Sequence, residues 1–508
     1  MELKTAKFVL PFLSIEPSIF ADLYPVQLLI KFSLYIFSRF LMFSLLKCAI
    51  FPTFKIMNFY FRIIIFLPLI FSLNSCYKLS NDFERPNVIL IMADDLGYET
   101  LGINGSNYDT PVLDSLALNG INFTNAFSQP LCTPSRVKIM TGKPNYINYE
   151  YFTFLNPSEK TFGNLFKDRG YRTALVGKWQ LNGVQFDLKN NQDLNRPYNF
   201  GFDEYCLWWL NERGSRFANP NIIENGKKLQ LNIDDYGPDI FTNYIINFID
   251  KNKENPFFIY YPMALVHDPF QPTPNSKDWI DQNKRQKGNK VIYFSEMVNY
   301  MDTVVGRIVN SLKKNNLDNT ILIFIGDNGT DNRVVTLNNG KKIRGAKGST
   351  IKYSSNVPLI INWKKELKNN FQSDVLIDLT DFYSTFEDIL DKKIKQSFGK
   401  SLLPLILKKD YEERKILITY YNPMWGNSNP KIKRGVYAQT KKYKLYKNGK
   451  FYNYSNDLLE RSPLKFNDLS KKQKDIYKKL LQSLDTIPSL PKYNHNKWIE
   501  KKIIKKDN

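Results

Sequence analysis

Short apolar runs alternate with amphipathic stretches along the chain from Asn87 onward. Residues 88–92 (Val-Ile-Leu-Ile-Met) and residues 321–325 (Ile-Leu-Ile-Phe-Ile) are continuous apolar runs, which are typical of strands buried on both faces of a sheet. Further strand candidates are residues 173–176, 257–261, 357–361 and 416–420. Helices are expected between them, so the alternation predicts an α/β fold.

Two of the intervening segments have clear helical signals. Residues 294–312 carry apolar side chains at helical spacing and predict a long amphipathic helix. Ser158 is a good N-cap for a shorter helix that ends at Gly170.

The pattern changes after Pro404, where short strand-like runs are separated by turns. Asn448-Gly449 lies between two such runs and predicts a hairpin, and residues 471–484 predict a closing helix. We therefore expect three regions, of which the second is a small α+β subdomain with an antiparallel sheet. They are a main domain over residues 86–405, the C-terminal subdomain over residues 410–490, and a basic tail over residues 491–508.

Polar side chains follow the ends of four predicted strands. They are Asp94 with Asp95, Lys178, His267, and Asp327 with Asn328. In open α/β sheets, binding sites form beyond the carboxyl ends of the strands. The sequence therefore predicts that these side chains meet at one edge of the sheet.

The carboxylates and the amide of this set predict a metal site. Asp94, Asp95, Asp327 and Asn328 offer only oxygen ligands, which suit Ca²⁺ or Mg²⁺, and their charge and number favour Ca²⁺. Zinc prefers nitrogen and sulfur ligands, and the chain has only two His. Each acidic pair alone is ordinary turn chemistry, so the prediction rests on their combination.

Residues 132–136 read Cys-Thr-Pro-Ser-Arg and are followed by Met-Thr-Gly-Lys at 140–143. A structural thiol does not need such a pattern. The motif resembles the signature of the formylglycine-dependent sulfatases of the alkaline-phosphatase-like superfamily. The resemblance covers about residues 86–457 through motifs in the same order, and their combination is highly specific. They are residues 91–97, the Cys132 motif, residues 177–179, His267 before Pro269, residues 326–329 and residues 344–348.

The resemblance implies an alkaline-phosphatase-like fold, with a large mixed sheet flanked by helices, and a sulfatase active site within residues 86–405. A maturase would oxidise Cys132 to formylglycine, whose hydrate attacks the sulfur and also touches the metal. The remaining roles are implied by motif. Arg136 orients the hydrate, Lys178 and Lys347 hold the sulfate oxygens, His267 donates a proton or hydrogen bond to the leaving oxygen, and Asp94, Asp95, Asp327 and Asn328 bind the metal. Asp327 is in addition a candidate acceptor of the nucleophile's proton.

One position departs from the family pattern. After Gly177-Lys178-Trp179 the family usually has a His that contacts the formylglycine, whereas this chain has Gln180. Gln can hydrogen-bond but cannot accept a proton near neutral pH. The departure therefore affects the step that regenerates the nucleophile.

Composition adds information about partners. The chain of 508 residues carries 71 Lys and Arg against 49 Asp and Glu, a net charge of +22, which favours an anionic partner: a sulfated polymer, an anionic membrane or nucleic acid. A solvated, lysine-rich surface explains the charge equally well. No nucleic-acid-binding motif accompanies the charge, which argues against a nucleic-acid partner. Four Cys cannot form a disulfide framework in a chain of this length.

The N-terminal region predicts export. A short basic segment at residues 57–62 precedes an apolar run at residues 63–73, which is too short to span a bilayer and suits a signal peptide. Leu73-Asn74-Ser75-Cys76 resembles a lipobox, so residues 57–76 predict a lipoprotein signal peptide with a lipid on Cys76. An ordinary signal peptide is the alternative. The expected location is the bacterial periplasm or the outer membrane.

Residues 1–56 fit this picture poorly. An apolar stretch at residues 28–51 is interrupted by Lys31, Arg39 and Lys47, and a charge near the centre of a membrane helix costs about 2.5–3.5 kcal/mol on insertion scales. We interpret residues 1–56 as a non-native upstream extension, with a membrane-inserted segment as the alternative.

The leading hypothesis is an exported sulfatase that hydrolyses a sulfate ester on a carbohydrate. The alternatives are a phosphonate or phosphoester hydrolase of the same superfamily and a catalytically weakened homologue that binds sulfated glycan. Trp208 and Trp209, near Arg213 and Arg216, are consistent either with a sugar-binding surface or with core packing.

Overall fold

The computed structural model describes residues 84–186, 188, 190–367, 370–392, 398–424 and 433–491. The predicted upstream extension, the signal peptide with Cys76, and all of the basic tail except residue 491 lie outside these ranges. Among the described helices, none combines the length and the hydropathy that a membrane span requires.

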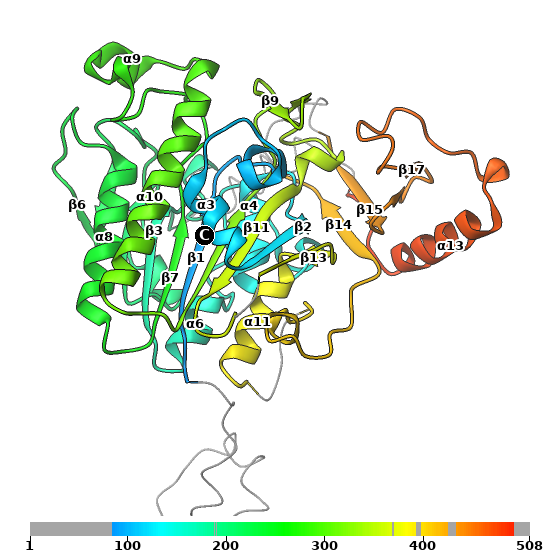
Figure 1. Ribbon diagram of the computed structural model, residues 1–508, viewed down its shortest axis with the longest axis horizontal. Coiled ribbons are helices and arrows are strands. Elements are labelled where there is room, and N and C mark those ends of the chain that lie inside the picture. The colour runs from blue at the N-terminus through cyan, green and yellow to red at the C-terminus, as the bar shows by residue number, and fades with distance from the viewer. Residues whose placement is uncertain are drawn as a thin grey trace, which may run out of the picture. The chain divides into compact units, whose positions relative to one another are not determined.

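A large mixed sheet forms the centre of the fold (Figure 1). Its eleven strands follow the order β12-β2-β11-β8-β1-β7-β3-β4-β5-β6, and β13 pairs with β2. The strands are β1 (Asn87–Ala93), β2 (Ile121–Phe127), β3 (Arg172–Lys178), β4 (Glu204–Trp208), β5 (Ile222–Glu224), β6 (Lys227–Lys228), β7 (Phe257–Pro262), β8 (Thr320–Gly326), β11 (Asn356–Trp363), β12 (Phe371–Ser373) and β13 (Ile377–Asp378).

The central strands β8, β1, β7, β3 and β4 run parallel, whereas β11 runs antiparallel to both β8 and β2. Successive side chains of β1 enter two different cores, because a strand points alternate residues to opposite faces. Val88 and Leu90 belong to one apolar cluster, and Ile89 and Ile91 belong to the other. The continuous apolar run in the sequence is therefore explained by burial on both faces.

Helices cover both faces of the sheet, and α3, α8 and α10 pack together on one of them (Figure 1). On the other face α4, α6 and α11 contact one another. The helices are α3 (Pro111–Leu118), α4 (Cys132–Thr141), α5 (Asn145–Asn148), α6 (Phe162–Lys167), α7 (Arg196–Asn199), α8 (Gly237–Asn252), α9 (Gln282–Lys287), α10 (Phe294–Lys314), α11 (Thr380–Ile389) and α12 (Leu403–Ile406). The predicted α/β class with a large mixed sheet is confirmed.

The predicted long helix corresponds to α10, but the N-cap predicted for the shorter helix is wrong. Thr161, not Ser158, caps α6, and its hydroxyl accepts a hydrogen bond from the Gly163 amide at 3.1 Å. Ser158 instead donates its own amide and hydroxyl hydrogens to Asn156. The local turn around Asn156 therefore uses the hydroxyl that was expected to start the helix.

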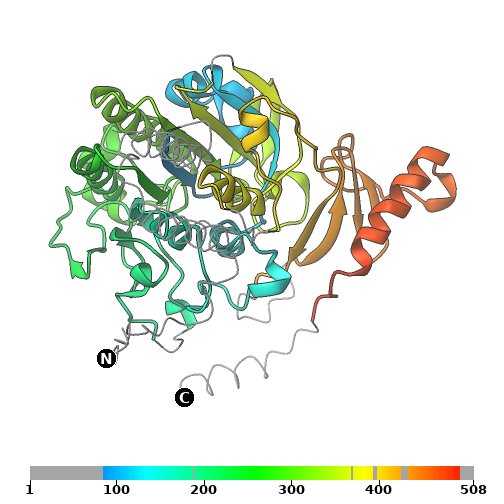
Figure 2. The ribbon, with the colours of Figure 1, turned by 90° about the horizontal axis from the view of Figure 1, so that it is seen from below.

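A smaller antiparallel sheet and one helix follow the large sheet and lie to one side of it, in orange and red in Figure 2. The strands are β14 (Leu417–Tyr421), β15 (Gly435–Gln439), β16 (Tyr443–Tyr446) and β17 (Phe451–Asn453), paired in that order. The helix α13 (Lys471–Asp485) packs against β15 and β16. The predicted hairpin at Asn448-Gly449 connects β16 and β17, so the expected C-terminal antiparallel sheet is confirmed.

Candidate active site

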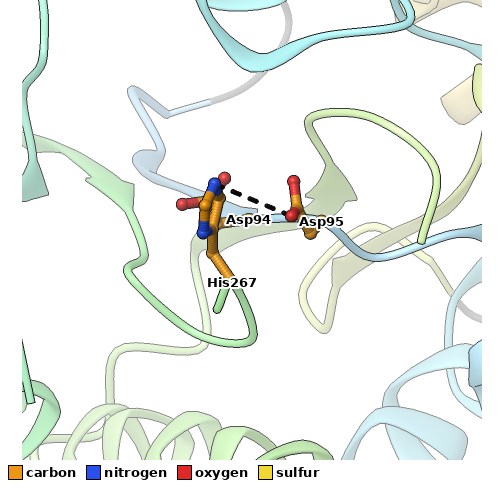
Figure 3. Close-up of side chains that lie close together, drawn as sticks. All are labelled: Asp94, Asp95 and His267. Atoms are coloured by element: carbon orange, nitrogen blue, oxygen red, sulfur yellow. Dashed lines mark ion pairs between the residues drawn. The ribbon is translucent and has the colours of Figure 1, made fainter. Parts of the chain in front are cut away.

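The carboxyl ends of four adjacent strands deliver the predicted polar residues to one edge of the large sheet. Asp94 and Asp95 follow β1, Asp327 follows β8, Lys178 ends β3, and His267 lies beyond β7. Figure 3 shows Asp94, Asp95 and His267 close together. The carboxylates are fully buried, with no exposed surface at Asp94, Asp95 or Asp327. The strand-end argument therefore places these side chains together as expected.

Gly177 shows why the strand ends in this way. Its φ of 115° lies in the left-handed region, and a Cβ at this position would lie 2.2 Å from the carbonyl oxygen of Pro262 in β7. Only glycine allows this close approach of the two strands. The next residue, Lys178, is thereby directed into the site.

Three carboxylates and one amide form the candidate metal centre. The Asp95 amide donates to Asp327 Oδ1 at 3.1 Å, and Asn328 Nδ2 donates to Asp95 Oδ1 at 2.9 Å. Asp94 Oδ1 and Asn328 Oδ1 are buried and accept no hydrogen bond from any described residue. Buried polar oxygens normally have a partner, and hard oxygens are the donors that Ca²⁺ and Mg²⁺ prefer. This set of donors therefore fits a divalent cation.

The charges of this cluster perturb its carboxyl groups in opposite directions. Burial, followed by repulsion from Asp94, raises the pKa of Asp327 to about 7. Burial also disfavours the charge of Asp94, but the cations of Lys178, Arg136 and Lys347 together hold the pKa of Asp94 well below its usual value. Asp94 therefore stays charged at neutral pH.

Cys132 is the first residue of α4 and is buried. Its Sγ lies 3.4 Å from Gln180 Oε1. Pro134 is tolerated in the first helical turn because the amides there have no partner within the helix. Ser135 accepts a hydrogen bond from the Gln129 amide at 3.0 Å and donates one to the Leu131 carbonyl at 2.9 Å. The motif residues thus fix the helix start that carries residue 132.

Arg136 lies one helical turn further along and binds Asp327. Its Nη2 and Nε donate to Asp327 Oδ2 at 2.9 and 3.2 Å, and its Nη1 donates to the Lys178 carbonyl at 3.2 Å. Asp94 Oδ1 lies 3.8 Å from Nη2. The guanidinium therefore orients a candidate metal ligand, while its expected contact with a modified residue 132 stays a prediction.

Both predicted lysines bond to aspartates of the metal centre. Lys178 Nζ donates to Asp94 Oδ2 at 2.7 Å, and Lys347 Nζ donates to Asp95 Oδ2 at 2.6 Å. Burial disfavours the charge of Lys347, but Asp95 raises the pKa of Lys347 above its usual value. Lys347 is consequently an ammonium group at neutral pH.

The Lys347 ammonium defines the hydrogen bonding of His267. Lys347 Nζ lies 2.9 Å from His267 Nε2, and because an ammonium can only donate, Nε2 accepts. The hydrogen of the neutral ring then lies on Nδ1, which is 2.7 Å from Asp268 Oδ1. Burial lowers the pKa of His267, which agrees with a neutral ring.

The sequence analysis missed Asp268 and Arg333 as parts of the site. Arg333 Nη2 donates to Asp268 Oδ2 at 2.8 Å, and Asp331 holds the same guanidinium. Asp268 stands next to His267 in the chain, but an Asp before Pro is an ordinary turn signal. No sequence pattern connects it with Arg333, which lies 65 residues away.

The tryptophan pair is buried: Trp208 is 0% and Trp209 is 6% exposed. Arg216 stacks over the Trp208 ring at 4.1 Å, and Arg213 stacks over the Trp209 ring at 4.9 Å. Of the two interpretations left open by the sequence, core packing describes Trp208. Arg216, however, lies against the site, with Nη1 4.0 Å from Asp94 Oδ2.

The small C-terminal sheet holds the loop that carries Lys347. Lys444 Nζ and Tyr446 Oη donate to the Thr350 carbonyl at 2.8 and 3.1 Å, and Tyr421 Oη donates to the Gly348 carbonyl at 3.3 Å. Lys444 is itself buried and paired with Glu460. The C-terminal sheet therefore contributes to the placement of one active-site lysine.

Comparison with known proteins finds relatives that match most of the chain. Residues 86–392 match the family model described as Sulfatase, and residues 347–488 match the model described as N-sulphoglucosamine sulphohydrolase, C-terminal. An N-acetylgalactosamine-6-O-sulfatase of Bacteroides thetaiotaomicron is 28% identical over 442 residues, covering 70% of this chain and 84% of that protein. An uncharacterized sulfatase, YdeN, of Escherichia coli is 29% identical over 414 residues, covering 68% and 72%.

Two solved structures show the likeness of the fold. The crystal structure of Ps i-CgsB in complex with k-i-k-neocarrahexaose has a TM-score of 0.65 at 24% identity, covering 83% of this chain and 98% of that chain. The structure of BT4656 in complex with D-glucosamine-2-N,6-O-disulfate has a TM-score of 0.64 at 23% identity, covering 80% and 99%.

Proposed function

Since this chain belongs to the sulfatase family and is a sulfuric ester hydrolase, we propose that it hydrolyses a sulfate ester on a carbohydrate, using a formylglycine formed from Cys132 and a bound divalent cation. One observation carries this proposal: Cys132, at a helix start, lies beside the carboxylates of Asp94 and Asp327, and two lysines bond to the same cluster. Nucleophile, metal ligands and cations thus share one sheet edge.

A carbohydrate substrate is supported by the relatives. The Bacteroides relative is named for N-acetylgalactosamine 6-O-sulfate chemistry, and one structural neighbour was solved with a sulfated glucosamine. The excess of basic residues, 71 against 49 acidic, is consistent with an anionic polymer as substrate.

The cation would be held by Asp94, Asp95, Asp327 and Asn328, whose hard oxygens favour Ca²⁺, with Mg²⁺ as the second choice. When bound, it offsets the negative charge that gathers on the sulfate oxygens during the transfer. Lys178 and Lys347 would donate to the same sulfate group, since both ammonium groups already point into the cluster. Fixed positive charge in a water-poor site is an effective way to stabilise a transition state.

Residue 132 would supply the nucleophile after a maturase, with its oxidant, has converted the thiol to an aldehyde. One hydroxyl of the hydrated aldehyde takes the sulfuryl group as the alcohol leaves, and the other then expels bisulfate and restores the aldehyde. His267 Nε2 and Lys347 Nζ, 2.9 Å apart, are the groups from which the leaving oxygen would receive a proton or hydrogen bond.

The proposal is tested by co-expression with a formylglycine-forming maturase, followed by mass spectrometry of the peptide that contains Cys132 and by sulfate release from a panel of purified sulfated oligosaccharides. We expect the aldehyde at residue 132 and release that is lost in Cys132→Ala. Cys206→Ala is the matched control, because Cys206 is also a buried free thiol but lies in β4. An unmodified Cys132 together with no sulfate release would overturn the proposal.

We also propose export with a lipid on Cys76, supported by the pattern of residues 57–76. The expected location is the periplasm or the outer membrane, with the lipid holding the protein on a membrane face without a spanning helix. Metabolic labelling with a radioactive fatty acid should mark the wild type and not Cys76→Ser. Equal labelling of both proteins would contradict the lipid assignment.

A further inference from the structure

Arg216 is a buried cation at the candidate active site, and one of its terminal nitrogens has no hydrogen-bonding partner among the described residues. It lies between β4 and β5 and is 3% exposed. Its Nη1 has no hydrogen-bond partner among the described residues. The nearest carboxylate oxygen, Asp94 Oδ2, is 4.0 Å away, which is too far for a hydrogen bond. Leaving a buried charged donor unpaired is costly, so this side chain needs an explanation.

The loop around Arg216 is held firmly in place. Trp208 Nε1 donates to the Gly214 carbonyl at 3.3 Å, and the Asn221 amide donates to the Ser215 carbonyl at 2.8 Å. A Cβ at Gly237, the first residue of α8, would lie 2.1 Å from the Arg216 carbonyl oxygen, so glycine is needed for this contact. The guanidinium stacks on the buried Trp208 ring. The loop therefore fixes Arg216 rather than leaving it free to reach solvent.

Asp94 cannot fully satisfy Arg216, because other cations already bind this carboxylate. Lys178 donates to Asp94 Oδ2 at 2.7 Å, and Arg136 lies 3.8 Å from Oδ1. By formal charges the cluster has four cations, Arg136, Lys178, Arg216 and Lys347, against three carboxyl groups, Asp94, Asp95 and Asp327, an excess of at least one positive charge. A divalent cation increases this excess, and a site with excess positive charge favours an anionic ligand.

Taking the proposed sulfatase function as its basis, we propose that Arg216 is a substrate-binding residue whose Nη1 donates a hydrogen bond to an oxygen of the sulfate group bound beside Lys178. The guanidinium suits this task because its planar set of donors matches the oxygens of an oxyanion. Stacking on Trp208 holds its plane, so little conformational freedom is lost when the anion binds. Burial lowers the pKa of Arg216 to about 10, which leaves the group charged at neutral pH.

The competing explanation is that Arg216 only balances the charge of Asp94. The two explanations predict different effects of an Arg216 substitution on the affinity for inorganic sulfate. As a substrate-binding residue, Arg216 contributes directly to sulfate affinity, whereas a purely structural Arg216 contributes to folding stability alone. Sulfate binding requires neither turnover nor the formylglycine, so the measurement is separate from the test of hydrolysis.

The experiment is calorimetric titration of the full chain with inorganic sulfate at saturating Ca²⁺ and constant ionic strength, because salt screens such contacts. We expect the Kd for sulfate to rise about 10- to 100-fold in Arg216→Gln, as the loss of a charge-assisted hydrogen bond predicts. Arg216→Lys, which keeps the charge but loses the planar set of donors, should give a smaller rise. Millimolar guanidinium should restore part of the affinity of Arg216→Ala.

Arg285 provides a matched control. It is likewise buried and stacked on a tryptophan, Trp279, at 4.9 Å, but it pairs with Asp234 instead of facing the site. Arg285→Gln should lower the thermal unfolding temperature without changing the Kd for sulfate. An unchanged Kd in folded Arg216→Gln, or in Arg216→Lys if the first variant does not fold, would overturn the Arg216 assignment alone. No sulfate binding by the wild type would also overturn this assignment, whereas the proposed function is judged separately by sulfate release from the oligosaccharides.

Discussion

Gln180 occupies the position beside residue 132 where proton transfer is needed, and Gln180→His is the change that tests its effect most directly. Gln180 Oε1 is 3.4 Å from Cys132 Sγ, and the side chain is 4% exposed. Its backbone has a φ of 59° and its amide donates to the Trp209 carbonyl at 3.1 Å. His is enriched among the residues that accept this left-handed conformation, so the substitution should preserve the local backbone.

The expected gain follows from what the two side chains can do. Gln can accept a hydrogen bond but not a proton, whereas a well-placed general acid or base contributes about 10²–10⁴-fold. Two features reduce this gain here. Asp327 is an alternative base close to Cys132, and the nearby Lys178 and Arg136 disfavour a protonated imidazole. We therefore expect kcat to rise about 10- to 100-fold, or about 1.4–2.7 kcal/mol of barrier.

Rapid-quench kinetics separate the two halves of the reaction. If release of sulfate from residue 132 limits the wild type, the alcohol should appear in a burst followed by slow turnover. Gln180→His should shrink the burst while raising the steady rate, and Gln180→Asn, which keeps an amide, should not. A folded, formylglycine-bearing Gln180→His whose kcat is equal to or below that of the wild type would refute the reasoning. Asp327 or a water molecule would then be sufficient as the base in the step that regenerates the aldehyde of residue 132.

Three further predictions concern the cation, the histidine and pH. Ca²⁺ at 100 times its Kd should raise the free energy of unfolding by about 2.7 kcal/mol, seen as a higher Tm that EDTA reverses; no shift would contradict the metal assignment. Asp268→Asn should lower kcat/KM about tenfold, because the hydrogen bond to His267 Nδ1 at 2.7 Å loses its charge assistance. Asp331→Asn, which also touches Arg333 but not His267, should have less effect, and equal losses would exclude a specific role for Asp268. Burial raises the pKa of Asp302 to about 6, so its contribution to stability is present at low pH and is lost as pH rises through that value. The stability of wild type minus that of Asp302→Asn should fall by up to about 3 kcal/mol between pH 4 and 7, and a flat difference in denaturant titrations would contradict this.

The arrangement of the strand ends could be predicted from the sequence because it depends on a simple rule. Buried parallel strands appear as continuous apolar runs, and their carboxyl ends share an edge. The runs ending before Asp94 and Asp327 are such strands, and β1 and β8 pair along seven residues. The same rule predicted the position of Lys178 directly, because Lys178 is the last residue of β3. The rule also placed His267 at this edge, although the strand that leads to it ends five residues earlier.

The parts that could not be predicted depend on loops and on competition between local hydrogen bonds. Ser158 and Thr161 are both favourable N-caps by residue type, and the choice depends on the turn at Asn156. The Asp268–Arg333 pair joins two loops. The contacts from Lys444 to the Thr350 carbonyl join the small sheet to an active-site loop across 94 residues. None of these has a periodic signal, because each is fixed by the path of an irregular segment.

Lys178 and Lys347 couple the binding of the cation to the binding of the sulfate group. In the structure Lys178 and Lys347 each bond to an aspartate oxygen of the candidate metal centre, at 2.7 and 2.6 Å. A divalent cation bound to the same carboxylates competes with these ammonium groups for negative charge and repels them. A sulfate group offers them new acceptors, so sulfate relieves the competition that the cation introduces. Because coupling between two ligands is reciprocal, each should bind more tightly in the presence of the other. The rise in Tm caused by Ca²⁺ should therefore be larger when sulfate is present, because both ligands act on Lys178 and Lys347.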